Sequence, residues 1–200
     1  MPGTLVLGTA NRKKGLELAD LVRPLGIAVR NLADYPQALA VVENGATFAD
    51  NARLKAQQQA RHLGQWVLAD DSGLCVDALG GAPGIYSARF ARPDATDEDN
   101  NRLLLERLAG VTIQRRTAHY VCHVTLADPQ GAIRAESEAA CHGRILEQEQ
   151  GSGGFGYDPM FEIIEYHRTF GLLSPAVKAC ISHRARAMRE ILPELQRWLG

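Results

Sequence analysis

The stretch TLVLGTANRKKGLELADLVRPLGIAVRN, residues 4–31, carries the pattern that decides the fold class. Its first five residues form a short apolar run typical of a buried strand, and residues 27–31 predict a second strand. Between them, apolar side chains share one face of a helix over about residues 13–25, and Gly26 is typical of a helix stop. This alternation of strand and helix continues along the chain, which predicts an α/β fold.

The rest of the chain contains no internal repeat, low-complexity tract or linker, so one domain over residues 1–200 is predicted. In the first half of the chain, the later patterns predict a helix over 47–63, a strand over 66–69 that ends at Asp70-Asp71-Ser72-Gly73, and a helix after Thr96. The second half predicts antiparallel strands over 117–127 and 132–142 and a Gly-rich loop over 148–159. A long final helix is predicted to start at Ser174-Pro175 and to break near Pro193.

The composition excludes several classes of protein. Apolar residues make up 46% of the chain, and 22 basic against 23 acidic side chains leave a net charge of -1, which argues against a nucleic-acid-coating protein. No apolar run is long enough for a membrane span, and residues 1–7 have no basic region or cleavage site typical of a secretory signal. The four dispersed cysteines therefore indicate reduced thiols in a cytosolic protein. Of the basic residues, 18 are Arg and only four are Lys.

The turn TANRKK, residues 9–14, lies between the first strand and its helix. Such a turn presents backbone N–H groups and the positive end of a helix, which together favour a phosphate, and two lysines add charge. An ordinary polar turn with solvated lysines is the alternative, and the Walker A spacing is absent.

Asp70 and Asp71 follow a predicted strand, where open α/β sheets bind ligands. Two carboxylates there are suited to Mg²⁺ and to deprotonating a water molecule. Because neighbouring strand residues point to opposite sides, we expect the two carboxylates to have different roles. A capped turn at the strand end is the alternative.

Two further segments carry candidate residues. In GSGGFGYDP, residues 151–159, glycines allow close approach of a ligand and aromatic rings can stack on a base; a flexible loop with an aromatic anchor is the alternative. In the last helix, Lys178 and Arg184 can bind phosphate or the edge of a base; solvent-exposed surface charges are the alternative interpretation. His119, Cys122 and His123 resemble metal ligands, but in a strand Cys122 faces away from the two histidines.

In order along the chain, five motifs resemble the inosine triphosphate pyrophosphatase family, and in particular its bacterial dITP/XTP pyrophosphatase branch. They are TANxxK at 9–14, FxDNAxxKA at 48–56, ADDSGLCVDALGGAPGIYSARF at 69–90, GGFGYDP at 153–159 and KxxISHR at 178–184. The resemblance implies an elongated, twisted mixed sheet flanked by helices, two lobes with a central cleft, and a homodimer. It also implies Mg²⁺-dependent hydrolysis of ITP, dITP and XTP to monophosphate and pyrophosphate.

The resemblance assigns a role to each matching residue. Asp71 is the expected general base and, with Glu43, a metal ligand, while Lys55 is a phosphate-side or structural cation. The remaining residues are expected to bind substrate: Thr9, Ala10, Asn11, Arg12, Lys13 and Lys14 around the triphosphate with Lys14 the main cation, Ser72 beside them, Phe155, Gly156, Tyr157 and Asp158 at the base with Phe155 stacking, and Lys178, His183 and Arg184 at base and phosphate.

Three departures from the family pattern stand out: Ala10 replaces a usual Gly, Asp50 a usual Glu and Ala185 a usual Gly. None removes a residue assigned to catalysis. Two other functions remain open: a nucleotide-binding sensor without turnover, and a similar pyrophosphatase that acts on other modified nucleotides. Retention of Asp71 and Glu43 argues against the sensor, because binding alone needs no base.

Overall fold

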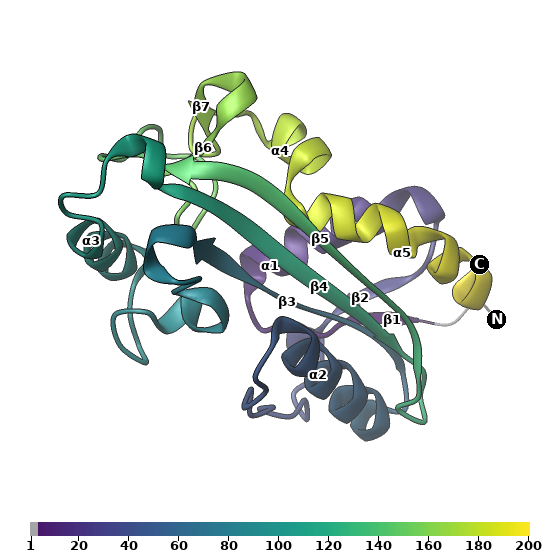
Figure 1. Ribbon diagram of the computed structural model, residues 1–200. Helices are drawn as coiled ribbons and strands as arrows, with labels where there is room; N and C mark the ends of the chain where they lie inside the picture. The colour runs from purple at the N-terminus through teal and green to yellow at the C-terminus, as the bar shows by residue number, and fades with distance from the viewer. Residues whose placement is uncertain (1–3) are drawn as a thin grey trace. The chain divides into compact units, whose positions relative to one another are not determined.

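The computed structural model describes residues 4–200. The prediction that residues 1–7 carry no secretory signal therefore falls partly outside the described residues. Seven strands form one mixed sheet in the order β2-β1-β3-β4-β5-β6-β7, which confirms the α/β prediction (Figure 1). β1 pairs in parallel with β2 and β3, whereas β6 pairs antiparallel with β5 and β7. The strands are β1 (Leu5–Leu7), β2 (Val29–Asn31), β3 (Trp66–Val76), β4 (Thr117–Ala127), β5 (Ile133–Ile145), β6 (Phe161–Ile163) and β7 (Arg168–Thr169).

Five α-helices accompany the sheet in the described part of the chain. They are α1 (Arg12–Val22), α2 (Phe48–Leu63), α3 (Asp97–Arg107), α4 (Pro175–Ile181) and α5 (His183–Leu199). Thr47 and Thr96 cap α2 and α3 through capping boxes with Asp50 and Asp99, as their spacing predicts. Among residues 4–200, no helix is long and apolar enough to cross a membrane.

The chain divides into two compact units, in agreement with the two predicted lobes, whereas the single domain and the central cleft stay predictions. Unit 1 comprises Met1–Asp71, Cys122–Ala139 and Arg184–Gly200, and unit 2 comprises Ser72–Val121 and Ala140–His183. The chain therefore passes from unit 1 to unit 2 after Asp71 and again after Ala139, and it returns to unit 1 after Val121 and after His183.

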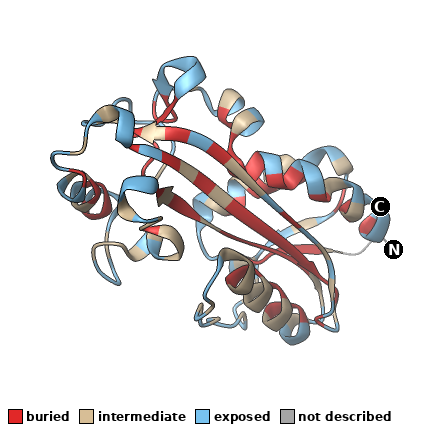
Figure 2. Ribbon diagram, viewed as in Figure 1, coloured by how far each residue is buried: buried red, intermediate tan, exposed pale blue. Residues whose placement is uncertain are grey.

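Each unit has its own hydrophobic core. In unit 1, α1 and α5 pack on one face of the strands through residues such as Leu18 and Met188, while α2 covers the other face through Ala56 and Ala60 (Figure 1). In unit 2, Leu104 and Leu108 of α3 pack with Phe161 and other buried side chains. Figure 2 shows the resulting run of buried residues along the strands.

Two sequence predictions about element ends were wrong. The strand predicted over 66–69 continues to Val76, so Asp70 and Asp71 lie inside an 11-residue strand instead of in a turn after it. The final helix breaks at Ser182, whose backbone is extended, and continues through Pro193. Pro193 is exposed, so water can satisfy the carbonyl group that loses its helical hydrogen bond there.

Gly143 of β5 allows a close approach that no other residue type permits. A Cβ atom at this position would lie 2.3 Å from the carbonyl oxygen of Glu162 and 2.7 Å from the ring of Phe161. We expect Gly143→Ala to lower the free energy of unfolding by about 1–3 kcal/mol, because a methyl group overpacks this core. Urea denaturation measures the change.

Gly15→Ala is the matched control, because its Cβ would meet side-chain atoms only at 3.4 Å or more inside helix α1. The control is expected to be neutral or stabilising by about 0.5 kcal/mol, since both variants lose the same freedom in the unfolded chain. Equal stability changes in the two variants would contradict the steric explanation.

Candidate active site

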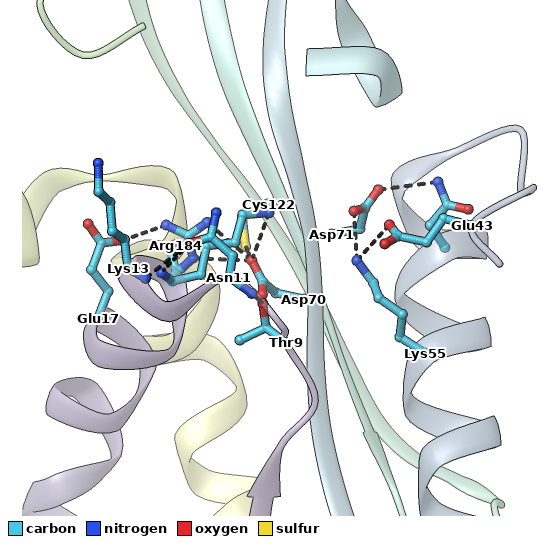
Figure 3. Close-up of polar contacts among 12 residues, drawn as sticks. Thr9, Asn11, Lys13, Glu17, Glu43, Lys55, Asp70, Asp71, Cys122 and Arg184 are labelled. Atoms are coloured by element: carbon cyan, nitrogen blue, oxygen red, sulfur yellow. Dashed lines mark hydrogen bonds and ion pairs between the residues drawn. The ribbon is translucent and has the colours of Figure 1, made fainter. Parts of the chain in front are cut away.

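Asp70 and Asp71 point to opposite sides of β3 (Figure 3). Asp70 is fully buried and Asp71 is 7% exposed, so neither carboxylate is solvated as a surface aspartate would be. Burying a carboxylate is costly unless cations or hydrogen-bond donors surround it. Each side of the strand supplies a different set of such partners, while the different roles expected for the two carboxylates stay a prediction.

On one side, Asp70 is held by cations from α1 and α5. Its Oδ2 atom accepts hydrogen bonds from Nε and Nη2 of Arg184 at 3.2 and 3.1 Å, and Nζ of Lys14 lies 3.8 Å away. Burial opposes ionisation of Asp70, but the charges of Lys14, Arg184 and Lys55 hold its pKa well below the usual range. Arg184 is itself 1% exposed and also pairs with Glu17 at 2.5 Å.

On the other side, Asp71 faces α2. Its Oδ1 atom accepts a hydrogen bond from Nζ of Lys55 at 2.8 Å, and the same ammonium group donates to Oε2 of Glu43 at 2.9 Å. Burial raises the pKa of Asp71 despite the neighbouring lysines. Burial also opposes ionisation of Glu43, but the charge of Lys55 lowers the pKa of this carboxyl group below its usual value. One cation thus bridges the carboxylate expected to be the general base, Asp71, and the second expected metal ligand, Glu43.

Asn51 is a site residue that sequence reasoning missed. Its side chain is 1% exposed, donates to Oδ2 of Asp71 at 3.4 Å and accepts from the backbone N–H of Gly45 at 2.8 Å. It therefore connects β3 to the segment that carries Glu43. The available signal was its position four residues before Lys55, which places both on one face of α2.

The turn over residues 9–14 has a more closed geometry than its sequence predicts. Asn11 is the N-cap of α1, and its side chain accepts hydrogen bonds from the backbone N–H groups of Lys13 and Lys14. The hydroxyl of Thr9 accepts from the N–H of Asn11. Three N–H groups expected to face a phosphate are thus engaged within the turn. Ala10 and Arg12 are exposed.

Unit 2 brings together a second group of predicted residues. Nζ of Lys178 lies 2.6 Å from Oδ2 of Asp158 and 4.5 Å from the ring centroid of Phe155, although Lys178 is only 7% exposed. Tyr157 points into the core and donates from its hydroxyl to the carbonyl oxygen of Ser87 at 2.7 Å. His183 stacks on Tyr120 with ring centroids 4.6 Å apart.

These contacts separate the predicted residues by exposure. Phe155 and Gly156 are half-buried, whereas Tyr157, Asp158 and His183 are buried among protein atoms. Ser72 is half-buried in β3, directly after Asp71.

The carboxylate pair fits the metal that the family resemblance implies. Across residues 4–200, no group of three or more His, Cys, Asp or Glu side chains is arranged to hold a metal ion. Mg²⁺ does not need such a group, because it commonly uses one or two carboxylates and takes its other oxygens from water and substrate phosphates. Glu43 and Asp71 supply such oxygens, and Lys55 now balances their charge.

The Ham1 family model matches residues 5–194 of the chain. The chain belongs to the Ham1 family. It is 51% identical over 193 residues to the dITP/XTP pyrophosphatase of Rhodopirellula baltica, covering 96% of this chain and 93% of that protein. It is 47% identical over 193 residues to the dITP/XTP pyrophosphatase of Desulforamulus reducens, covering 96% of each.

A solved structure of a Ham1-family protein has the same fold. The HAM1 protein of Coxiella burnetii superposes with a TM-score of 0.88 at 34% identity, over 97% of this chain and 98% of that one. The predicted family and fold class are therefore confirmed.

The ion pair between Asp70 and Arg184 is expected to be a large contribution to stability. Asp70→Asn would take a carboxylate away from the buried guanidinium of Arg184, which also pairs with Glu17, and we expect this to cost about 3–5 kcal/mol of unfolding free energy. Urea denaturation at neutral pH measures this loss.

Asp20→Asn serves as the control, because Asp20 pairs with Arg23 at the surface of α1. An exposed pair of this kind contributes about 0–1 kcal/mol. A loss of less than about 1 kcal/mol in Asp70→Asn as well would show that the buried pair does not stabilise the fold.

Proposed function

We propose that this protein is a Mg²⁺-dependent pyrophosphohydrolase that converts deaminated purine nucleoside triphosphates (dITP, ITP and XTP) to monophosphate and pyrophosphate. It removes these nucleotides from the cytoplasmic pool. The observation that carries the proposal is the cluster of Asp71, Glu43 and Lys55, in a chain that is 51% identical to a dITP/XTP pyrophosphatase. The active protein is one domain over residues 1–200 that forms a homodimer and acts without nucleic acid or membrane.

The chemistry of the substrate fits these side chains. A nucleoside triphosphate carries about four negative charges, which cations must balance before water can approach phosphorus. Bound Mg²⁺ would neutralise phosphate charge and lower the pKa of a water molecule. Glu43 and Asp71 would hold the metal, and Asp71 would accept the proton of the attacking water. Attack at the α-phosphorus makes pyrophosphate the leaving group.

Lys14 lies close enough to this cluster for its charge to lower the pKa of Glu43. We assign the triphosphate to the cations Arg12, Lys13, Lys14 and Lys55, with Thr9, Ala10, Asn11 and Ser72 beside them. A phosphate oxygen that takes the ammonium of Lys55 would release Asp71 from its present ion pair, so substrate binding and activation of the base are coupled through one side chain.

The base is assigned to the residues of unit 2. Phe155 offers a ring face for stacking, and Gly156, Tyr157 and Asp158 form its support. Lys178, His183 and Arg184 complete the binding of base and phosphate. A 6-keto purine presents an acceptor where adenine presents an amino donor, so a pocket donor would favour hypoxanthine or xanthine over adenine.

An assay of substrates and products tests this proposal. The protein is offered ITP, XTP, dITP, ATP and GTP with Mg²⁺, and the products are separated and identified. We expect monophosphate and pyrophosphate from ITP, XTP and dITP, little turnover of ATP, and no turnover after chelation of the metal. Release of single phosphates, or equal rates with ATP, would contradict the proposal, and binding without products would favour the nucleotide sensor.

The role of Asp71 has its own test. Asp71→Asn is expected to lower kcat about 10²–10⁴-fold, because an amide cannot accept the proton. Circular dichroism should show an unchanged fold. Asp128→Asn is the control, since Asp128 holds the β4–β5 turn through the N–H groups of Gln130 and Ala132. Near-normal activity in Asp71→Asn would place the base elsewhere.

A further inference from the structure

Helix α3 holds the loop that carries Phe155. Asp97, at the start of α3, accepts a hydrogen bond from the backbone N–H of Gly156 at 2.8 Å. Asn101, one turn further along, donates from Nδ2 to the carbonyl oxygen of Gly156 at 3.3 Å. Both bonds lie within unit 2. The two peptide groups that flank Gly156 are therefore both bonded to one helix.

The hydrogen bond from Asp97 also constrains Phe155. The direction of a residue's side chain depends on the two peptide planes that flank its Cα atom. The plane before Phe155 is held by Asp158, which accepts the N–H of Phe155 at 2.8 Å. The plane after Phe155 carries the N–H of Gly156 and is held by Asp97. Two carboxylates from different elements thus set the backbone of the residue proposed to stack on the base.

The loop needs this support because its own backbone is permissive. Phe155 lies between Gly154 and Gly156, which have positive φ angles of 76° and 62°. Glycine accepts such angles without strain but gains the most freedom when a loop opens. The hydrogen bonds from Asp158 within the loop and from Asp97 outside it therefore restrain where the ring of Phe155 points.

Helix α3 is a rigid support for this purpose. Asp97, Asn101, Leu104 and Leu108 follow helical spacing along one face. The two leucines are fully buried in the core of unit 2, so the apolar end of this face anchors the helix while its polar end reaches Gly156. Asn101 is 4% exposed and also donates to Oε1 of Glu149 at 2.8 Å, which fixes its amide orientation.

We infer that Asp97 and Asn101 are positioning residues for base recognition: they hold the Phe155–Gly156 backbone so that the aromatic ring is presented to the purine. The inference rests on the proposed function, because it assigns the base to Phe155. Neither residue is expected to touch the substrate, and neither belongs to the triphosphate side of the site. Their removal should weaken recognition of the base and leave phosphate binding unchanged.

The experiment compares Asp97→Ala with Glu98→Ala. Both remove one carboxylate from the first turn of α3, so they alter the helix terminus alike, and Asp97→Ala also removes the acceptor of the Gly156 N–H. With dITP as substrate, we expect Asp97→Ala to raise KM about tenfold with kcat changed less than threefold, the pattern of a lost binding contribution. Glu98→Ala should match the wild type. Asp97→Asn, whose amide oxygen can still accept the N–H, should restore most of the affinity.

Two inhibitors separate base recognition from phosphate binding. In Asp97→Ala, the inhibition constant of IMP should rise about as much as KM. The constant of inorganic tripolyphosphate, which has no base, should stay at the wild-type value. Equal changes for both inhibitors, or identical KM values in Asp97→Ala and Glu98→Ala, would overturn the inference.

A measurement without turnover distinguishes this inference from the proposed function. Hydrogen exchange of the Gly156 amide should be faster in Asp97→Ala than in Glu98→Ala, whatever the enzyme hydrolyses. If wild-type protein does not hydrolyse dITP, the proposed function fails. If it does and the exchange rates or KM values of the two variants agree, the positioning role fails.

Discussion

Two adjacent carboxylates are buried in the middle of one strand, and each must be neutralised from its own side of the sheet. The pleat of β3 sends Asp70 toward α1 and α5 and Asp71 toward α2 (Figure 3). Unpaired carboxylates at this depth would cost several kcal/mol each. Lys14 and Arg184 meet this requirement on one side of the strand, and Lys55 meets it on the other.

The two aspartates use their partners differently. Asp70 is held by an arginine that is itself buried, so its charge is fixed and its role is to support the surrounding helices. Asp71 is paired with the flexible ammonium of Lys55, which also contacts Glu43. Lysine can exchange partners without loss of charge, whereas a planar guanidinium bonded on two sides cannot do so readily. The buried arginine pair is therefore suited to stabilise the fold, and the lysine pair is suited to respond to a bound phosphate.

Local signals in the sequence predicted the local parts of this structure. The capping boxes at Thr47 and Thr96 placed two helices correctly, because cap and first turn lie within four residues. Asp-Asp-Ser-Gly looked like a turn, yet β3 continues, since Asp70 is stabilised by Arg184, which is 114 residues away in sequence. Five ordered motifs identified the family and the candidate site residues. They gave no role to Asn51, which lies inside the motif at 48–56, or to Asp97, because the partners Asp71 and Gly156 are known only once the chain has folded.

The small number of lysines in this chain has a chemical consequence. The chain has four lysines, and three of them, Lys14, Lys55 and Lys178, each pair with a buried aspartate. Lys13 is the exposed one, next to Lys14. In most proteins, acylating metabolites react with many surface lysines that have no function. In this chain, all four lysines are themselves proposed to bind the triphosphate or the base. Acylation of any one of them would therefore impair nucleotide binding.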